Sequence, residues 1–162
     1  MSLPSLAKRP YVLSPEEGDA SWFAGGLMVA KVTGSQTQGH FELLDQLLPP
    51  NYAAPRHIHR REDEAWWVLE GEATFFCGDE ELKAAPGSFV FLPMGIEHTF
   101  KVGPYGARLL TMAAPAGFAD FVKEAGEPAS SPTLPPPGAM DVERLARIAA
   151  TYGIEITGPP PA

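Results

Sequence analysis

Four side chains near the middle of the sequence have the types and the spacing of a metal site. His57 and His59 are one residue apart, and on a β-strand the side chains at positions i and i+2 point to the same face. Two imidazole nitrogens can therefore approach one ion at the roughly 2 Å that coordination requires. Glu64 follows the turn-like residues RRED, and His98 follows a second turn. The pattern predicts a transition-metal site with nitrogen and oxygen ligands.

The predicted site would leave room for chemistry at the ion. Three imidazoles and one carboxylate leave at least one position of a roughly five- or six-coordinate ion open. That position would admit water, dioxygen or an oxygen atom of a substrate. We predict one divalent transition metal, and these donors accept iron, nickel, manganese, zinc, cobalt or copper. Glu64 is predicted to be a ligand and a candidate catalytic proton acceptor.

Three apolar side chains are predicted to line a substrate pocket beside the metal. Trp66 has the same strand parity as Glu64. Phe100 and Val102 have the same parity as His98, so alternation turns all three toward the interior. Walls of this kind favour a flat aromatic or enol-type ligand. Core packing alone also explains an inward tryptophan, and that interpretation stays open.

The elements that would position these residues are short strands. Between residues 27 and 115, glycine or proline interrupts the sequence every roughly 8 to 12 residues, which is typical of an all-β sandwich or barrel. The predicted strands are residues 27–32, 40–48, 64–70, 72–78, 87–93, 98–103 and 107–113. The tight sequence EGEA predicts a hairpin between the third and the fourth of them. Because no helical stretch separates the strands, we expect them to be antiparallel.

The chain is predicted to contain three parts. Residues 1–24 form an N-terminal arm, residues 25–115 form the barrel, and residues 116–162 form short C-terminal helices with a proline-rich linker. One helix would end at Gly126 and the other would begin at Asp141, because apolar residues recur at helical spacing between such end signals. The closing helix needs a surface to cover, either the barrel or a partner subunit.

The two histidine-containing stretches resemble the two motifs of the cupin superfamily. The matching residues are His57, His59, Glu64 and Gly71 in the first motif, and Gly87, Pro93, Gly95 and His98 in the second. The first motif of the family usually opens with a glycine where this chain has Asn51, a residue that tolerates positive φ. The second often closes with an asparagine where this chain has Val102. The resemblance implies an all-β double-stranded β-helix, a small jelly-roll barrel, with the four metal ligands inside it.

The resemblance also implies a function. The proline-rich segment and the ending YGIEITGPP are similar to those of bacterial single-domain cupins of the quercetin 2,3-dioxygenase type. The expected function is that of a metal-dependent, dioxygenase-like oxidoreductase acting on a small aromatic or enol-type substrate. Two alternatives stay open: a metal-dependent isomerase or lyase that works without oxygen, and a noncatalytic cupin that binds a small molecule. A barrel that has lost its metal is a further alternative.

Composition and charge bear on partners and location. The formal net charge of −8 would repel a nucleic-acid backbone, and no apolar run reaches the roughly 18 residues that span a bilayer. We expect neither nucleic acid nor a membrane as a partner, and a cytoplasmic protein with one reduced cysteine. Trp67 is predicted to face outward as a candidate homodimer contact. The charged run RREDE is interpreted as a solvated loop, and His40 as a structural or surface histidine.

Overall fold

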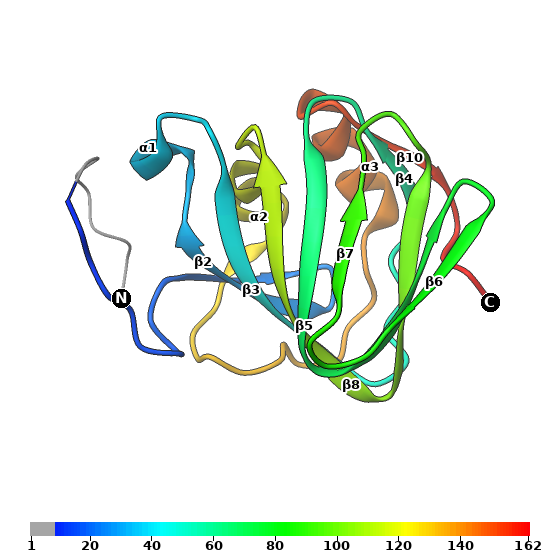
Figure 1. The fold of residues 1–162 in the computed structure, drawn as a ribbon, viewed down its shortest axis with the longest axis horizontal. Coiled ribbons are helices and arrows are strands. Elements are labelled where there is room, and N and C mark those ends of the chain that lie inside the picture. Colours follow the sequence, from blue (N-terminus) through cyan, green and yellow to red (C-terminus); the bar gives the residue numbers. More distant parts are fainter. Residues whose placement is uncertain (1–8) are drawn as a thin grey trace.

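The computed structural model describes residues 9–162, in which antiparallel β-strands dominate. The strands are β1 (Asp19–Phe23), β2 (Gly26–Val32), β3 (Glu42–Leu48), β4 (Arg56–His59), β5 (Asp63–Cys77), β6 (Glu80–Ala84), β7 (Phe89–Leu92), β8 (His98–Ala114), β9 (Glu127–Pro128) and β10 (Ile154–Gly158). The helices are α1 (Gly34–Thr37), α2 (Phe118–Ala125) and α3 (Val142–Thr151). The all-β jelly-roll class with short C-terminal helices is confirmed (Figure 1).

Two long strands, β5 and β8, run through both layers of the barrel and connect them. They pair with each other from Asp63 opposite Ala114 to Cys77 opposite His98. One half of this pair belongs to a layer with the order β9, β1, β2, β3, β8, β5, β7, and the other half to a layer with the order β10, β4, β8, β5, β6. Because β9 and β10 end the order without pairing with each other, the sheet is not closed.

The hairpin predicted at EGEA is wrong, because residues 63–77 form a single bent strand. Gly71 has φ +73°, and the register with β8 shifts on both sides of it. A Cβ atom at this position would lie 2.1 Å from the carbonyl oxygen of Gly106. The glycine therefore lets β5 bend closely against β8, and the chain reverses only at Gly78, before β6. β8 likewise replaces two of the predicted strands.

Several strands were not predicted from the sequence. β1 lies in the part interpreted as an N-terminal arm, yet it pairs with β2 from Asp19 opposite Ala30 to Phe23 opposite Gly26. β6, β9 and β10 were also missed. Residues 1–8 of the expected arm lie outside the described part of the chain.

α2 and α3 lie behind the first layer in the view of Figure 1. Asp141 caps α3 as predicted, because its side chain accepts a hydrogen bond from the Arg144 backbone N–H at 2.9 Å. Buried side chains of both helices pack with strand residues in one core cluster. The helix residues in this cluster include Phe118, Phe121, Val122, Leu145 and Ala149. α3 thus covers the barrel of its own chain. None of the helices in residues 9–162 is long and apolar enough to cross a membrane.

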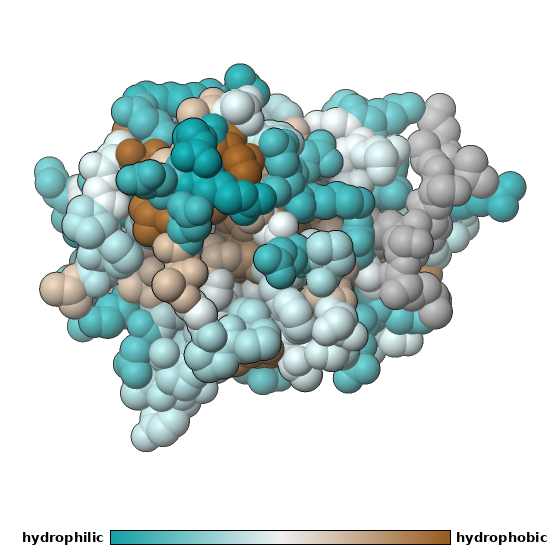
Figure 2. All heavy atoms as spheres, turned by 180° about the vertical axis from the view of Figure 1, so that it is seen from behind, coloured by the Kyte–Doolittle hydropathy of each residue, from teal (hydrophilic) through white to brown (hydrophobic). Residues whose placement is uncertain are grey.

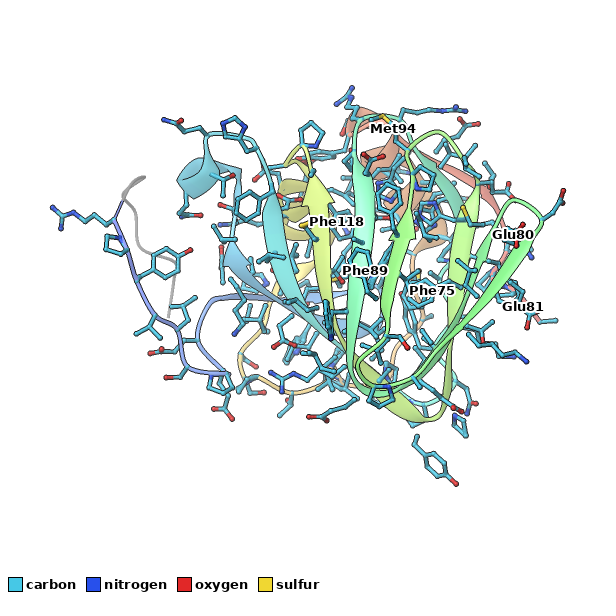
Figure 3. The ribbon with its side chains drawn as sticks, viewed as in Figure 1. Phe75, Glu80, Glu81, Phe89, Met94 and Phe118 are labelled. Carbon is cyan, nitrogen blue, oxygen red and sulfur yellow. The ribbon has the colours of Figure 1, made fainter. Side chains whose placement is uncertain are left out.

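Alternation on β5 separates an inner face from an outer face. Trp66 is 3% exposed whereas Trp67 is 49% exposed, in agreement with the predicted parity. Phe89 and Phe91 on the neighbouring strand β7 are also exposed, and Phe89 lies over the front layer in Figure 3. In the opposite view, hydrophobic residues gather at one end of the molecule between hydrophilic ones (Figure 2). The homodimer expected through Trp67 stays a prediction.

Candidate metal centre

The four side chains predicted as metal ligands converge inside the barrel. They are His57, His59, Glu64 and His98, and one ligand atom from each lies within 4.8 Å of the others. They come from β4 and from the first residues of β5 and β8. His57 and His98 sit opposite each other on paired strands. Apart from the half-buried His57, these side chains are at most 3% exposed.

Backbone carbonyl groups orient two of the histidines. His57 Nδ1 lies 2.6 Å from the Pro55 carbonyl oxygen, and His98 Nδ1 lies 3.1 Å from the Ile96 carbonyl oxygen. Because a carbonyl oxygen only accepts hydrogen bonds, each Nδ1 carries a proton and donates it. The Nε2 atom of each ring is then directed to the site as a metal donor.

A carboxylate orients the third histidine. His59 Nδ1 donates to Glu62 Oε1 at 2.7 Å, and the side chains are only 1% and 4% exposed. The interpretation of Glu62 as part of a solvated loop is therefore wrong, because this residue folds back under the ligand. A usable signal was present in the sequence: metal-binding histidines commonly donate their second ring nitrogen to an acceptor, and an acidic residue follows His59 by three positions.

We expect Glu62→Ala to weaken binding of a divalent metal by roughly 10- to 100-fold, the range found when such an outer partner is removed. Glu62→Gln should lose less, because its amide oxygen still accepts from His59 Nδ1. Titration of Co²⁺ or Zn²⁺ in competition with a chromophoric chelator measures the affinity. Glu70→Ala is the control, since Glu70 is 70% exposed and outside the site. Equal affinities for Glu62→Ala and the wild type would contradict the orienting role.

Two of the four ligands, His57 and Glu64, have protonation states that suit a cation. Burial, helped by His98 and His59, lowers the pKa of His57 to about 3, so this ring is neutral at neutral pH. Burial acts to raise the pKa of Glu64, but the charge of His59 and the contact with His98 outweigh it and lower the pKa to about 2. At His59, burial acts to lower the pKa, whereas Glu64 and Glu62 raise it overall. His59 therefore holds its second proton more tightly than a free imidazole does, and this proton must leave before Nε2 can bind a metal.

The donor atoms fit a divalent transition metal. Glu64 Oε2 lies 3.0 Å from His59 Nε2 and 2.9 Å from His98 Nε2. The His57 ring centre is 5.0 Å from that of His59 and 4.5 Å from that of His98, so its free nitrogen joins the same group. Imidazole nitrogens with one carboxylate suit several first-row metals. These four side chains would hold the ion.

A cavity of about 60 Å³ adjoins the ligands. Both layers of the barrel and both C-terminal helices contribute to its wall, which is largely apolar and aromatic; Figure 3 labels one of these residues, Phe118. Tyr52 lies against Phe100 with a ring separation of 5.8 Å, and Phe118 lies against His59 at 5.8 Å. Among the described residues that line the cavity there is no lysine or arginine.

Two of the three predicted pocket residues line this cavity. Trp66 and Phe100 do so, and their ring centres are 6.3 Å apart. Val102 does not line it: the side chain is 1% exposed, packs in the core and pairs with Ala73. Parity placed Val102 on the inner face correctly. However, Val102 is four positions beyond His98, which is roughly 13 Å along a strand and carries it past the cavity.

Comparisons with known proteins agree with this architecture. Residues 44–111 match the family model described as cupin domain. The chain is 23% identical over 151 residues to quercetin 2,3-dioxygenase of Bacillus subtilis (strain 168), a match that covers 93% of this chain and 45% of that protein. The chain therefore spans less than half the length of this curated relative.

Solved structures show the same fold. An RmlC-like cupin from Shewanella frigidimarina NCIMB 400 is 18% identical, with 72% of this chain and all 100% of that chain covered at a TM-score of 0.61. A protein with a double-stranded β-helix domain from Klebsiella pneumoniae is 16% identical, with 67% and 93% covered at a TM-score of 0.55.

The fold and the site together define a jelly-roll barrel with a histidine-rich centre. Residues 44–111 match the cupin domain model, and the barrel has the same fold as the solved RmlC-like cupin. Asn51 has φ +58°, so it adopts the left-handed conformation expected where the family usually has glycine.

Proposed function

We propose that the protein is a metal-dependent, dioxygenase-like oxidoreductase that binds an oxygen atom of a small aromatic or enol-type substrate at the metal. The observation that carries the proposal is that three of the four ligands, His57, His59 and Glu64, line an apolar cavity. Phosphate recognition would favour lysine or arginine, and the described lining residues include neither. The similarity to quercetin 2,3-dioxygenase supports the reaction type.

Some residues of the site would bind the metal ion, and others would form the wall of the cavity. A divalent transition metal, when bound, would supply a Lewis acid with an open position for an oxygen donor. Glu64 would remain an ionised ligand, since its pKa is about 2. The same low pKa makes it a weak proton acceptor at neutral pH, which favours the ligand role over the predicted role as a base.

The aromatic side chains would exclude water and present flat surfaces to the substrate. Trp66 and Phe100 belong to this wall, together with Tyr52. Burial raises the pKa of Tyr52 to about 12, so its phenol stays neutral beside a substrate oxygen that carries negative charge. A planar ligand would be held between such walls by dispersion and by the loss of apolar surface to water.

Oxygen consumption by the metal-loaded protein tests the reaction type. Protein loaded separately with iron, nickel, manganese, cobalt, copper or zinc is incubated with quercetin and with smaller enols and phenols, in air and under argon. We expect oxygen uptake with at least one metal, substrate loss only in air, and neither with His98→Ala. Turnover that continues under argon would favour a metal-dependent isomerase or lyase. Binding without turnover would favour a noncatalytic cupin, and either result would overturn the proposal.

A further inference from the structure

One buried polar atom in the wall of the cavity has no partner. The indole Nε1 of Trp66 makes no hydrogen bond within residues 9–162, and it is the only buried side-chain nitrogen or oxygen there of which this is true. The side chain is 3% exposed and lines the cavity. A buried indole N–H usually has an acceptor, so an unpaired one in a cavity wall indicates a donor kept for a ligand.

A second donor group, the carboxamide of Gln46, lies near Trp66 on the inner face of the sheet. Trp66 on β5 is opposite Thr111 on β8, and Gln46 lies on β3, the next strand beyond β8. All three side chains line the cavity, and Gln46 and Thr111 are only 4% and 1% exposed. Three neighbouring strands thus place an indole, a hydroxyl and a carboxamide side by side on the inner face.

The contact between Gln46 and Thr111 determines which hydrogen-bonding groups of these side chains remain for a ligand. The Thr111 hydroxyl donates to Gln46 Oε1 at 3.0 Å. Because this bond uses the carboxamide oxygen, the amide N–H groups of Gln46 are left as donors, and no other side-chain hydrogen bond of Gln46 occurs within the described residues. Trp66 and Gln46, which both line the cavity, therefore hold hydrogen-bond donors without a side-chain acceptor among the described residues, and an oxygen atom of a ligand would supply one.

The dimensions of the site limit the size of a substrate that can reach both the metal and the indole of Trp66. The ring of Trp66 is 6.2 Å from that of the metal-binding residue His98, so a molecule that contacts the metal and the indole is compact. At roughly 10 to 15 Å³ for each water-sized group, a cavity of about 60 Å³ holds roughly four to six such groups. Such a volume argues against a ligand with three rings and favours a small enol, with a single-ring phenol as the upper limit of size.

We propose that Trp66 Nε1 and the Gln46 carboxamide form a donor site for a second oxygen atom of the substrate. The substrate is then a compact enol or single-ring phenol, with one oxygen at the metal and a carbonyl-type acceptor held by these two side chains. The inference rests on the proposed function for the oxygen at the metal. It defines substrate specificity, whereas the oxygen-uptake experiment defines the reaction.

A pair of matched ligands tests the donor site in zinc-loaded protein. 3-Hydroxybenzaldehyde and 3-vinylphenol have the same shape, but only the aldehyde carries an acceptor oxygen on its side group. We expect the wild type to bind the aldehyde about tenfold more tightly, as one hydrogen bond would provide. Trp66→Phe and Gln46→Leu should each reduce this preference. Because both residues line the cavity, the ratio of the two affinities in each variant is the readout. Trp67→Phe is the matched control, since Trp67 faces outward.

Nuclear magnetic resonance reads the same contact directly. The protein has three tryptophans, so the indole ¹H–¹⁵N signals are assigned from single Trp→Phe variants. The aldehyde should shift the Trp66 signal downfield, whereas Trp22, whose Nε1 already donates to the Thr133 carbonyl at 2.8 Å, should not shift. An unchanged preference in Trp66→Phe, an unmoved Trp66 signal, or no binding of either phenol would each overturn the proposal. Because zinc-loaded protein needs no oxygen chemistry to bind, these outcomes are independent of the oxygen-uptake result.

Discussion

Replacement of His98 with alanine is expected to abolish tight metal binding while the barrel stays folded. His98 supplies one of the three imidazole nitrogens, and its Nε2 lies 2.9 Å from Glu64 Oε2. Loss of a direct ligand should lower the affinity by more than ~100-fold, the upper limit for loss of an outer partner. The fold should persist, because a separate apolar core between β5, β7 and β8 does not depend on the ion.

Elemental analysis of protein purified without chelators measures the metal content, and circular dichroism measures the fold. His57→Ala should behave in the same way. His40→Ala is the control, because His40 is exposed and does not belong to the ligand group. Unchanged metal content in His98→Ala would remove this residue from the site. An unfolded His98→Ala protein, or unfolding of the wild type on metal removal, would show that the ion holds the barrel together.

Local regularities explain why the ligand group was predictable from the sequence. The alternation of side chains on a strand placed His57 with His59 on one face, and it separated Trp66 from Trp67 correctly. The two motifs of the family then indicated that the segments containing His59 and His98 meet. The first two inferences need only spacing within one strand, whereas the meeting of the two segments follows from the family resemblance.

The misses share a different cause, because they depend on how distant segments close over one another. Gly71 has the sequence context of a hairpin, and only the close approach of Gly106 shows that β5 bends there. Glu62 lies in a charged run, and its burial depends on how the chain between β4 and β5 covers His59. Gln46 lies between the inward-facing Leu44 and Leu48, so strand parity alone places it inside. Its position near Trp66, however, depends on the order of β3, β8 and β5 in the sheet.

Replacement of Glu42 with glutamine is expected to flatten the pH dependence of stability. Glu42 is the first residue of β3 and is 1% exposed, and its Oε1 accepts a hydrogen bond from the Ala119 backbone N–H at 2.8 Å. This carboxyl group serves the start of α2, since the residue before the helix, Gly117, has no side chain to cap it. Burial, together with the charge of Asp120, raises the pKa of Glu42 to about 7, although the nearby backbone N–H groups act to lower it.

The sign of the effect follows from the protons bound in each state. An unfolded chain releases the Glu42 proton near the ordinary pKa of 4.5, whereas the folded chain holds it up to about pH 7. Between these values the folded state binds more protons, so the free energy of unfolding falls as pH rises. The stabilising contribution is fully present below about pH 4.5 and is lost as pH passes 7. The difference between the two pKa values corresponds to up to about 3 kcal/mol.

Urea unfolding of the metal-free proteins between about pH 5 and pH 8 measures this contribution. Glu42→Gln keeps an oxygen that accepts from Ala119 but has no charge, so its stability relative to the wild type should rise with pH by up to about 3 kcal/mol. Contributions from groups other than Glu42 are shared by both proteins and cancel in the difference. Glu81→Gln is the control, since Glu81 lies at the exposed edge of the barrel in Figure 3. Parallel pH profiles for Glu42→Gln and the wild type would mean that the Glu42 carboxyl is already ionised at low pH, stabilised by the N-terminus of α2.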